Sequence, residues 1–334
     1  MQLSTFRDKV HAELTGFAWD QWAQLGVFAP TYRHDRWAAD PEALLLFTLE
    51  IGRSDPRLLD EALDWLMTNE RSISVQRLRN LCADEDDRQL AEAAIAWVVR
   101  WQPGSRFALR RTTGPSREQR PLFRTVAQQV KIPDPAFFSV GLLKPDTEPS
   151  RKSQQPDLVL PISFAFRMRL LFGVGSRAEV VRYLLTDPNP DASAQMVADA
   201  AGYAKRNIRE TLTALASSRL VTTFERGNEH RYSINRGLWG QLLSFTPQTW
   251  PTYRDWPRLL RSLRHLTRWL DDPRLDQLSP YMLASEARSL MADLEPELAL
   301  AGIPASFPTS VLGEQYWDSF TEHVDHALST LKTR

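Results

Sequence analysis

Residues 193–221 read SAQMVADAAGYAKRNIRETLTALASSRLV, and apolar residues recur in this stretch at helical spacing. The first segment, 193–201, is short and ends at Gly202, which suits a tight turn because glycine tolerates a positive φ. The second segment starts near Ala204, and its apolar stripe consists of Ile208, Leu212 and Leu215. The stretch therefore predicts two helices joined by a turn.

Polar and cationic side chains crowd the start of the second helix and lie off its apolar stripe: Lys205, Arg206, Asn207, Arg209 and Thr213. A helix fits the major groove of DNA, where its N-terminal residues reach base edges. Arginine can pair with guanine and asparagine with adenine through two hydrogen bonds each. We expect Arg206, Asn207 and Arg209 to read bases and Lys205 to contact phosphate.

The period changes after this helix. Residues 220–235, LVTTFERGNEHRYSIN, alternate as two strands around Gly227-Asn228, a pair that suits a hairpin turn. Arg226 and Arg231 flank the tip of this hairpin, where they are expected to touch phosphate or the minor groove. One more amphipathic helix, 177–188, precedes the opening stretch.

The order helix, helix, turn, helix, hairpin over residues 162–236 resembles the winged helix-turn-helix domain of bacterial regulators of the MarR and ArsR kind. The resemblance implies sequence-specific binding of double-stranded DNA, transcriptional regulation and a homodimer. Two positions depart from the usual pattern: Arg219 stands where a glycine usually ends the third helix, and Ala204 where a capping serine or threonine is usual. A left-handed conformation at Arg219 costs about 1 kcal/mol or slightly more.

The whole chain predicts a mainly α protein with three domains and a linker. Residues 1–143 form a helical N-terminal domain, 144–157 a polar, proline-rich linker, 158–245 the winged helix-turn-helix domain and 246–334 a helical C-terminal domain. The run 56–125 has the outline of a degenerate second winged helix, with RFALRR (106–111) as a short strand. The terminal domains are expected to supply the dimer contact or a sensing surface.

Length and composition indicate a folded protein of two or three domains, because the chain has 334 residues, 43% of them hydrophobic and 25% charged. Cys82 is the single cysteine, which excludes a disulfide or a cysteine-based zinc site within one chain. Neither a signal peptide nor an apolar run of membrane-spanning length is present in the sequence. We therefore expect a cytoplasmic protein without membrane contact.

Charge is segregated along the chain although the net charge is zero. Residues 40–95 carry 13 acidic and 6 basic residues, whereas residues 100–131 carry 8 basic and 1 acidic residue. A further basic stripe, at helical spacing, consists of Arg254, Arg258, Arg261, His265 and Arg268. Arg258, Arg261 and Arg268 are candidates for phosphate contacts. The alternative is that the stripe pairs with the acidic C-terminal helices, and the basic segment 100–131 with acidic stretches of the chain.

The sequence offers little support for catalysis. His323 and His326 lack a third ligand nearby in the sequence, and neither a phosphate loop nor a cysteine–histidine nucleophile is present. We predict neither an enzyme nor a bound cofactor or metal. The main alternative to a DNA-binding regulator is an adaptor or antitoxin-like module whose helical domains hold a protein partner.

Overall fold

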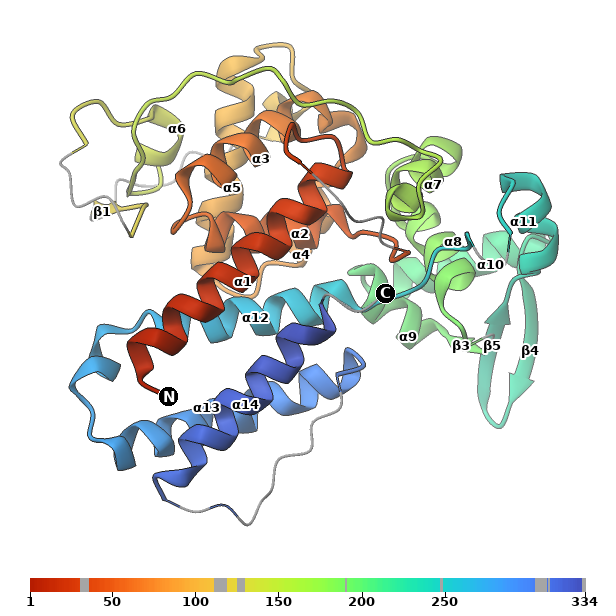
Figure 1. Ribbon diagram of the computed structural model, residues 1–334. Helices are drawn as coiled ribbons and strands as arrows, with labels where there is room; N and C mark the ends of the chain where they lie inside the picture. The colour runs from red at the N-terminus through yellow and green to blue at the C-terminus, as the bar shows by residue number, and fades with distance from the viewer. Residues whose placement is uncertain are drawn as a thin grey trace.

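The computed structural model describes residues 1–30, 36–110, 119–124, 130–189, 191–246, 249–303, 311 and 313–331. Most of these residues are helical, which confirms the predicted mainly α class. Figure 1 shows a large part that both ends of the chain build, with a smaller part beside it. We call the large part, residues 1–143 and 254–331, the helical body, and the smaller part, residues 161–246, the central unit.

The centre of the helical body is α2 (Pro41–Ile51), in which every residue is buried. A helix that is apolar nearly all round must be covered on all sides. The elements of the N-terminal half are α1 (Leu3–Gln24), α2, α3 (Pro56–Thr68), η1 (Glu70–Ser72), α4 (Val75–Asn80), α5 (Glu85–Trp101), η2 (Arg106–Arg110), β1 (Arg120–Pro121), α6 (Pro135–Phe138) and β2 (Leu142–Leu143). Helices α1, α3, α4 and α5 all pack against α2.

The C-terminal helices complete the same body. They are α12 (Trp256–Leu270), η4 (Pro273–Gln277), α13 (Pro280–Leu300) and α14 (Gln315–Thr330). Helix α12 packs its apolar face on α2, and α14 packs on α1. One hydrophobic core therefore contains residues from both ends of the chain, such as Phe6 and Phe320. Two separate terminal domains were expected from the sequence; the structure instead joins them, because α2 needs the cover that α12 provides.

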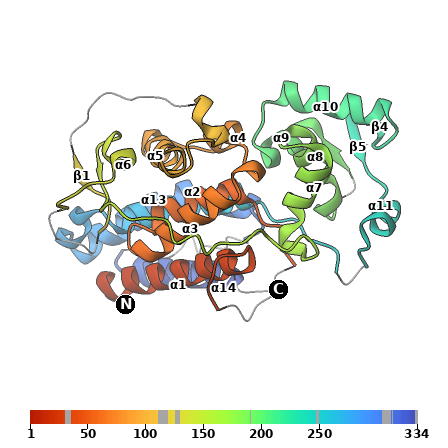
Figure 2. The ribbon, with the colours of Figure 1, turned by 90° about the horizontal axis from the view of Figure 1, so that it is seen from above.

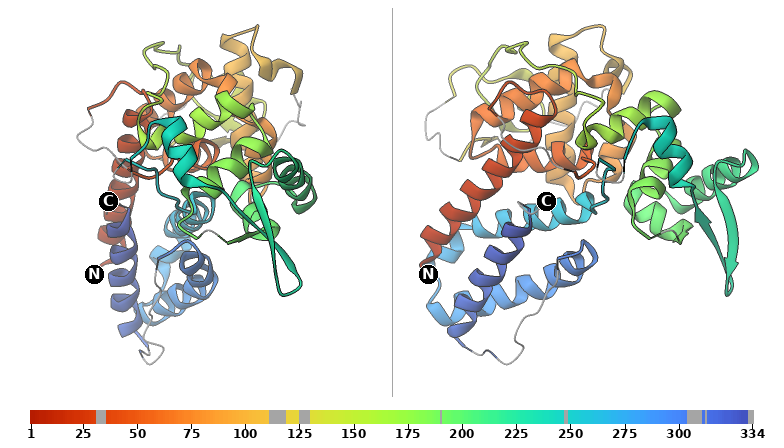
Figure 3. Two further views of the ribbon diagram at one scale, coloured as in Figure 1. Left: turned by 90° about the vertical axis from the view of Figure 1, so that its right-hand side faces the viewer. Right: turned by 45° about the vertical axis from the view of Figure 1, so that its right-hand side comes forward.

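The central unit has a hydrophobic core of its own, from Phe164 to Leu243. Its elements are η3 (Pro161–Ser163), α7 (Phe164–Phe172), α8 (Ser176–Thr186), β3 (Ala192–Ser193), α9 (Ala194–Ala201), α10 (Lys205–Ser217), β4 (Thr222–Arg226), β5 (Glu229–Ser233) and α11 (Arg236–Leu243). The three strands form an antiparallel sheet in the order β3-β5-β4. Figure 3 shows the β4–β5 hairpin extending away from the rest of the molecule.

The predicted elements of the central unit agree with the structure in their order. Ile208, Leu212 and Leu215 are the buried stripe of α10, and Gly202 adopts a left-handed φ of 67°. Arg219 also adopts a positive φ, of 60°, so the departure from glycine leaves the backbone conformation in place at a cost of about 1 kcal/mol. The sequence missed β3, because a strand of two residues is too short to show alternation.

The expected linker, residues 144–157, has no helix or strand, yet it lies against the helical body. The Asp64 carboxylate on α3 accepts hydrogen bonds from the backbone N–H groups of Arg151 and Ser153, at 2.6 and 3.1 Å. The Lys144 side chain is fully buried, and its Nζ lies 2.8 Å from Oδ1 of Asp60. The segment is therefore attached along α3, because its backbone polar groups find partners there.

The expected strand RFALRR is wrong, since residues 106–110 form the 3₁₀ helix η2. Strand β1 pairs in parallel with β2 rather than with a neighbouring hairpin strand. Within the described residues of 56–125, the hairpin of a second winged helix is therefore not seen, while residues 111–118 lie outside the described part.

Candidate nucleic-acid interface and its attachment to the helical body

Helix α10 presents its polar face to solvent. Its predicted reading residues, Lys205, Arg206, Asn207, Arg209 and Thr213, are all exposed. Arg206 pairs with Glu210 one turn later, at 3.0 Å, but its side chain is 88% exposed, so this pair contributes little to stability. The guanidinium of Arg206 is therefore available to another partner at small cost.

A groove of about 530 Å³ lies between α10 and the hairpin. Lys205, Arg209 and Thr213 line it from α10, and Asn228 and His230 line it from the hairpin. Of the predicted contacts, those of α10 at 205, 209 and 213 line this concave surface, whereas Arg226 and Arg231 of the hairpin do not. The Thr213 hydroxyl donates to the Arg209 carbonyl at 2.9 Å, so that hydroxyl is already partly engaged.

The two hairpin arginines differ in their surroundings. Arg226 is 72% exposed and forms an ion pair with Asp191, just before β3. Arg231 is only 21% exposed and lies between Glu229, at 2.8 Å, and Asp191, at 3.7 Å. The expected DNA contact of Arg231 therefore lacks support, because its side chain fastens the hairpin to the segment before α9. This pairing is not visible in the sequence, since Asp191 and Arg231 are 40 residues apart.

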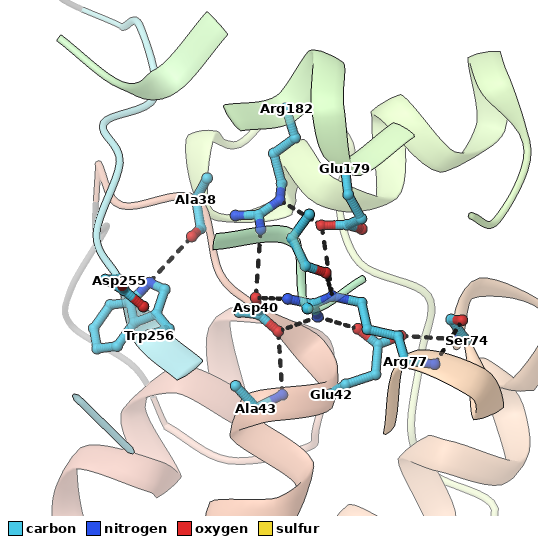
Figure 4. Close-up of polar contacts among 12 residues, drawn as sticks. Ala38, Asp40, Glu42, Ala43, Ser74, Arg77, Glu179, Arg182, Asp255 and Trp256 are labelled. Atoms are coloured by element: carbon cyan, nitrogen blue, oxygen red, sulfur yellow. Dashed lines mark hydrogen bonds and ion pairs between the residues drawn. The ribbon is translucent and has the colours of Figure 1, made fainter. Parts of the chain in front are cut away.

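Six buried charged side chains connect the central unit to the helical body: Asp40, Glu42, Arg77, Arg169, Glu179 and Arg182. We call this set the buried ion cluster. It contains three carboxylates and three guanidiniums, so its formal charge is zero. Figure 4 shows Arg77 reaching toward Asp40 and Glu42, with Arg182 and Glu179 above them. Sequence patterns missed all six residues.

The contacts within the buried ion cluster are short and mostly bidentate. Arg77 donates to Asp40 at 2.5 and 2.6 Å and to Glu42 at 2.8 Å. Arg169, from α7, donates to Glu42 and to Glu179 at 2.7 Å each. Guanidinium groups suit such planar, paired contacts. Because these charges are buried away from water, each one is stabilised by its partners within the cluster. Removing one member therefore destabilises the others.

The buried ion cluster makes the folded state sensitive to acid. Burial alone would raise the pKa of Asp40, but Arg77 and Arg182 lower it below its usual value. Burial would likewise raise the pKa of Glu179. The nearby guanidiniums of Arg169, Arg182 and Arg77 outweigh it and hold this pKa well below its usual range. Both carboxyl groups have lower pKa values in the folded state than in the unfolded chain. The two carboxylates therefore stabilise the folded state above about pH 5, and this contribution is lost as the pH falls below about 4.

We therefore expect the free energy of unfolding to fall steeply between pH 5 and pH 3, as proton uptake favours the unfolded chain. Urea titrations at a series of pH values measure this dependence. A free energy that stays constant from pH 7 to pH 3 would contradict the assigned pKa directions.

Helix α4 holds the turn that precedes α10. Arg77 Nε donates to the Ala201 carbonyl at 2.6 Å, and Asn80 Nδ2 donates to the Gly202 carbonyl at 2.9 Å. The Tyr203 hydroxyl lies 3.0 Å from Ser74 Oγ. These contacts from the helical body fix the turn between α9 and α10, and hence the direction in which α10 presents its polar face.

The basic stripe on α12 faces carboxylates of the same chain. Arg268 Nε, Nη1 and Nη2 donate to Glu50, Asp84 and Asp87 at 2.8, 2.5 and 2.6 Å. Arg258 lies near Asp255 (3.0 Å), Glu297 (3.4 Å) and Asp199 (3.9 Å), and Arg261 pairs with Glu297. Pairing within the chain describes this geometry better than phosphate contacts do, but of the predicted partners, the acidic C-terminal helices, only α13 takes part, through Glu297. The partners lie in the N-terminal half and the central unit as well as on α13.

Neutralising Arg258, Arg261 and Arg268 together is expected to lower the free energy of unfolding by about 1–3 kcal/mol, mainly because Glu50 and Asp87 are buried and lose a partner. Thermal melts of the alanine variant measure this loss. The salt dependence of DNA binding should stay unchanged. A salt slope lowered by about 0.9 for each lost arginine would instead show that the stripe contacts phosphates.

The basic segment 100–131 also pairs within the chain where it is described. Arg120 contacts Asp86 at 2.8 Å, and Arg124 contacts Glu50 at 2.6 Å and Asp271 at 2.8 Å. The Arg110 side chain and the whole of Arg111 and Arg117 lie outside the described part. These pairs favour the predicted contact with acidic stretches of the chain.

The described residues contain no cluster of three or more histidine, cysteine or acidic side chains arranged to hold a metal ion. Burial and the nearby Asp87 raise the pKa of the Cys82 thiol to about 12, which disfavours a reactive thiolate. None of the helices in the described ranges combines the length and the apolar character needed to cross a bilayer.

The surfaces that stand out are the polar face of α10, the groove beside it and the exposed hairpin. Comparisons with protein-family models, with curated proteins and with solved structures find no match to this chain.

Proposed function

We propose that this chain is a sequence-specific, double-stranded DNA-binding protein of the winged helix-turn-helix type that regulates transcription. The order of elements in the central unit supports this proposal. Helix α8, strand β3, helices α9 and α10 and the β4–β5 hairpin follow one another, and the sheet order is β3-β5-β4. In this arrangement α10 is the helix that enters the major groove and the hairpin is the wing.

The observation that carries the proposal is the contrast between the two faces of α10. Its buried face joins the core of the central unit, whereas its other face exposes cationic and amide side chains beside the groove. Arg206, Asn207 and Arg209 are the proposed base readers, because their groups match guanine and adenine edges. Lys205 and Arg226 are the proposed phosphate contacts.

The helical body has a defined part in this proposal. Most arginines of the chain's other basic regions are paired with carboxylates, while Lys205, Asn207 and Arg209 have no ion pair or side-chain hydrogen bond to the described residues. Lys205 and Arg209 are therefore among the exposed cations without an ion pair in the described residues, and Arg177 and Arg219 of the central unit are others. Contacts from α4 set the orientation of that helix against the body.

The proposal is tested by selecting duplexes from a random DNA library with the purified full-length chain. A shared sequence motif should emerge, and the affinity for it should fall as salt rises, with a slope of about −0.9 for each phosphate contacted. Selection of no motif, together with equally weak binding to every duplex, would reject sequence-specific recognition. A protein partner that co-purifies with the chain would then favour the adaptor function.

A further inference from the structure

Helices α4 and α9 lie side by side where the central unit meets the helical body (Figure 2). The start of α12 lies beside them, since Arg258 of α12 is 3.9 Å from Asp199 of α9. A cavity of about 500 Å³ lies between the three helices, and its lining includes Asn80 from α4, Asp199 from α9 and Arg258 and Arg261 from α12. Sites for small molecules typically enclose about 300–1,000 Å³, so this cavity has the size of such a site.

The charged side chains that line the cavity are two carboxylates, Asp199 and Asp255, and two guanidiniums, Arg258 and Arg261. Asp255 and Arg258 satisfy each other. The Asp255 carboxylate accepts hydrogen bonds from the backbone N–H and from Nη1 of Arg258, at 3.2 and 3.0 Å. Their side chains are only 9% and 25% exposed, so this pair is part of the cavity wall.

Asp199 and Arg261 keep hydrogen-bonding capacity that the chain does not use. Asp199 Oδ1 accepts from Gln195 at 2.7 Å, whereas Oδ2 has only the 3.9 Å contact with Arg258 among the described residues. Arg261 Nη2 pairs with Glu297, while its Nε and Nη1 have no hydrogen bond or ion pair to the part of the chain that the structure describes. The cavity therefore offers an acceptor on α9 and donors on α12.

This combination of charges favours ligands that carry both signs. An anion without a cationic group would pair with Arg261 but would also face the carboxylates of Asp199 and Asp255, and a simple cation would face the guanidiniums. A molecule with an ammonium and a carboxylate group can pair with both kinds of side chain through charge-assisted hydrogen bonds. Leu81 and Pro257 add apolar surface to the lining, against which an aliphatic side chain can pack.

We propose that this cavity binds a free α-amino acid, with its ammonium group on Asp199 and its carboxylate on Arg261. Such a ligand contacts the central unit and the helical body at once, and it stabilises the folded chain because the unfolded chain has no such site. Gly202 and Tyr203, in the turn before α10, also line the cavity. The ligand thus lies next to the turn that orients α10, at a site distinct from the groove proposed for DNA.

The test is thermal unfolding of the full-length chain without DNA, with each of the standard amino acids added separately at about 10 mM, followed by calorimetric titration of those that stabilise it. At least one amino acid should raise the melting temperature, by about 3–5 °C at about a hundredfold excess over its Kd. Acetate and ethylamine, which each carry one of the two groups, should bind at least tenfold more weakly.

The Asp199→Asn and Arg261→Gln variants should each raise the Kd of that amino acid at least tenfold. Both side chains are more than 40% exposed, so the variants should stay folded. The matched control is Asp272→Asn/Arg274→Gln, because it alters a carboxylate and a guanidinium that pair on η4, at the other end of α12. This control should bind the amino acid as the parent does.

Three results would overturn the proposal: no amino acid changes the melting temperature, acetate or ethylamine binds as tightly as the amino acid, or both single variants keep the parent's Kd. Circular dichroism checks that the variants are folded. Should either unfold, Ala204→Phe provides a second test, because Ala204 is exposed and lines the cavity, so a larger side chain there should exclude the ligand without removing a charge. Because DNA is absent, the outcome is independent of whether α10 binds DNA.

Discussion

Replacing Arg77 by methionine will lower the free energy of unfolding by about 3–5 kcal/mol. Arg77 is fully buried and is bonded to Asp40, Glu42 and the Ala201 carbonyl. Methionine fills a similar volume but leaves Asp40 with only Arg182, at 3.4 Å, and Glu42 with only Arg169, so the buried cluster carries an uncompensated negative charge. Breaking a buried ion pair from one side costs far more than the net contribution of the intact pair, because the remaining charge has lost its solvation.

Urea unfolding of the Arg77→Met variant measures this loss, with Arg206→Met as the matched control. Arg206 also pairs with a carboxylate, but it is 88% exposed, so its replacement should change the free energy of unfolding by less than about 0.5 kcal/mol. A loss below about 1 kcal/mol for Arg77→Met would mean that the buried ion cluster does not hold the central unit to the helical body as described.

Replacing Arg206 and Arg209 together by alanine will reduce the affinity for the selected DNA motif about 30-fold to 20,000-fold, since each bidentate contact to a base is worth about 1–3 kcal/mol. Both side chains are exposed and lie outside the core, so the thermal stability should stay within about 0.5 kcal/mol of the parent. Fluorescence anisotropy with the motif and with a scrambled duplex separates lost specificity from lost electrostatic attraction.

The control for this variant must change the net charge by the same amount. Arg88 and Arg274 serve this purpose, because both are exposed and lie on the helical body, away from α10. The Arg88→Ala/Arg274→Ala variant should keep the parent's affinity for the motif. An equal loss in both double variants would show that overall charge, not recognition by α10, governs binding.

The features that the sequence predicted are those that depend on residues close together in the chain. The spacing of Ile208, Leu212 and Leu215 predicted the buried stripe of α10 and, by exclusion, its exposed polar face. Gly227-Asn228 predicted the hairpin turn, and the polar composition of 144–157 predicted the absence of a helix or strand there. Each of these features is set by helix or strand periodicity and by turn chemistry, which act within a few residues.

The tertiary structure alone decided which charges are paired. Glu42 and Arg169 are 127 residues apart, yet they share a buried bidentate contact, and Arg268 meets Asp84 and Asp87 across more than 180 residues. A one-dimensional pattern of charge contains no distances, so it cannot separate a free basic stripe from a paired one. For this reason the sequence left the α12 stripe open between phosphate contacts and pairing within the chain, and it placed Arg231 among the DNA contacts.

The same limit explains the domain organisation. Residues 41–51 and 256–270 each form a helix with apolar residues to bury, but their pairing depends on which apolar face covers which. The hydrophobic effect is non-directional, and it acts in the same way between residues that are near or far apart in the sequence. The sequence thus determined the helices and the polar face of α10, while packing decided that the two ends of the chain share one core and that α4 holds the turn before α10.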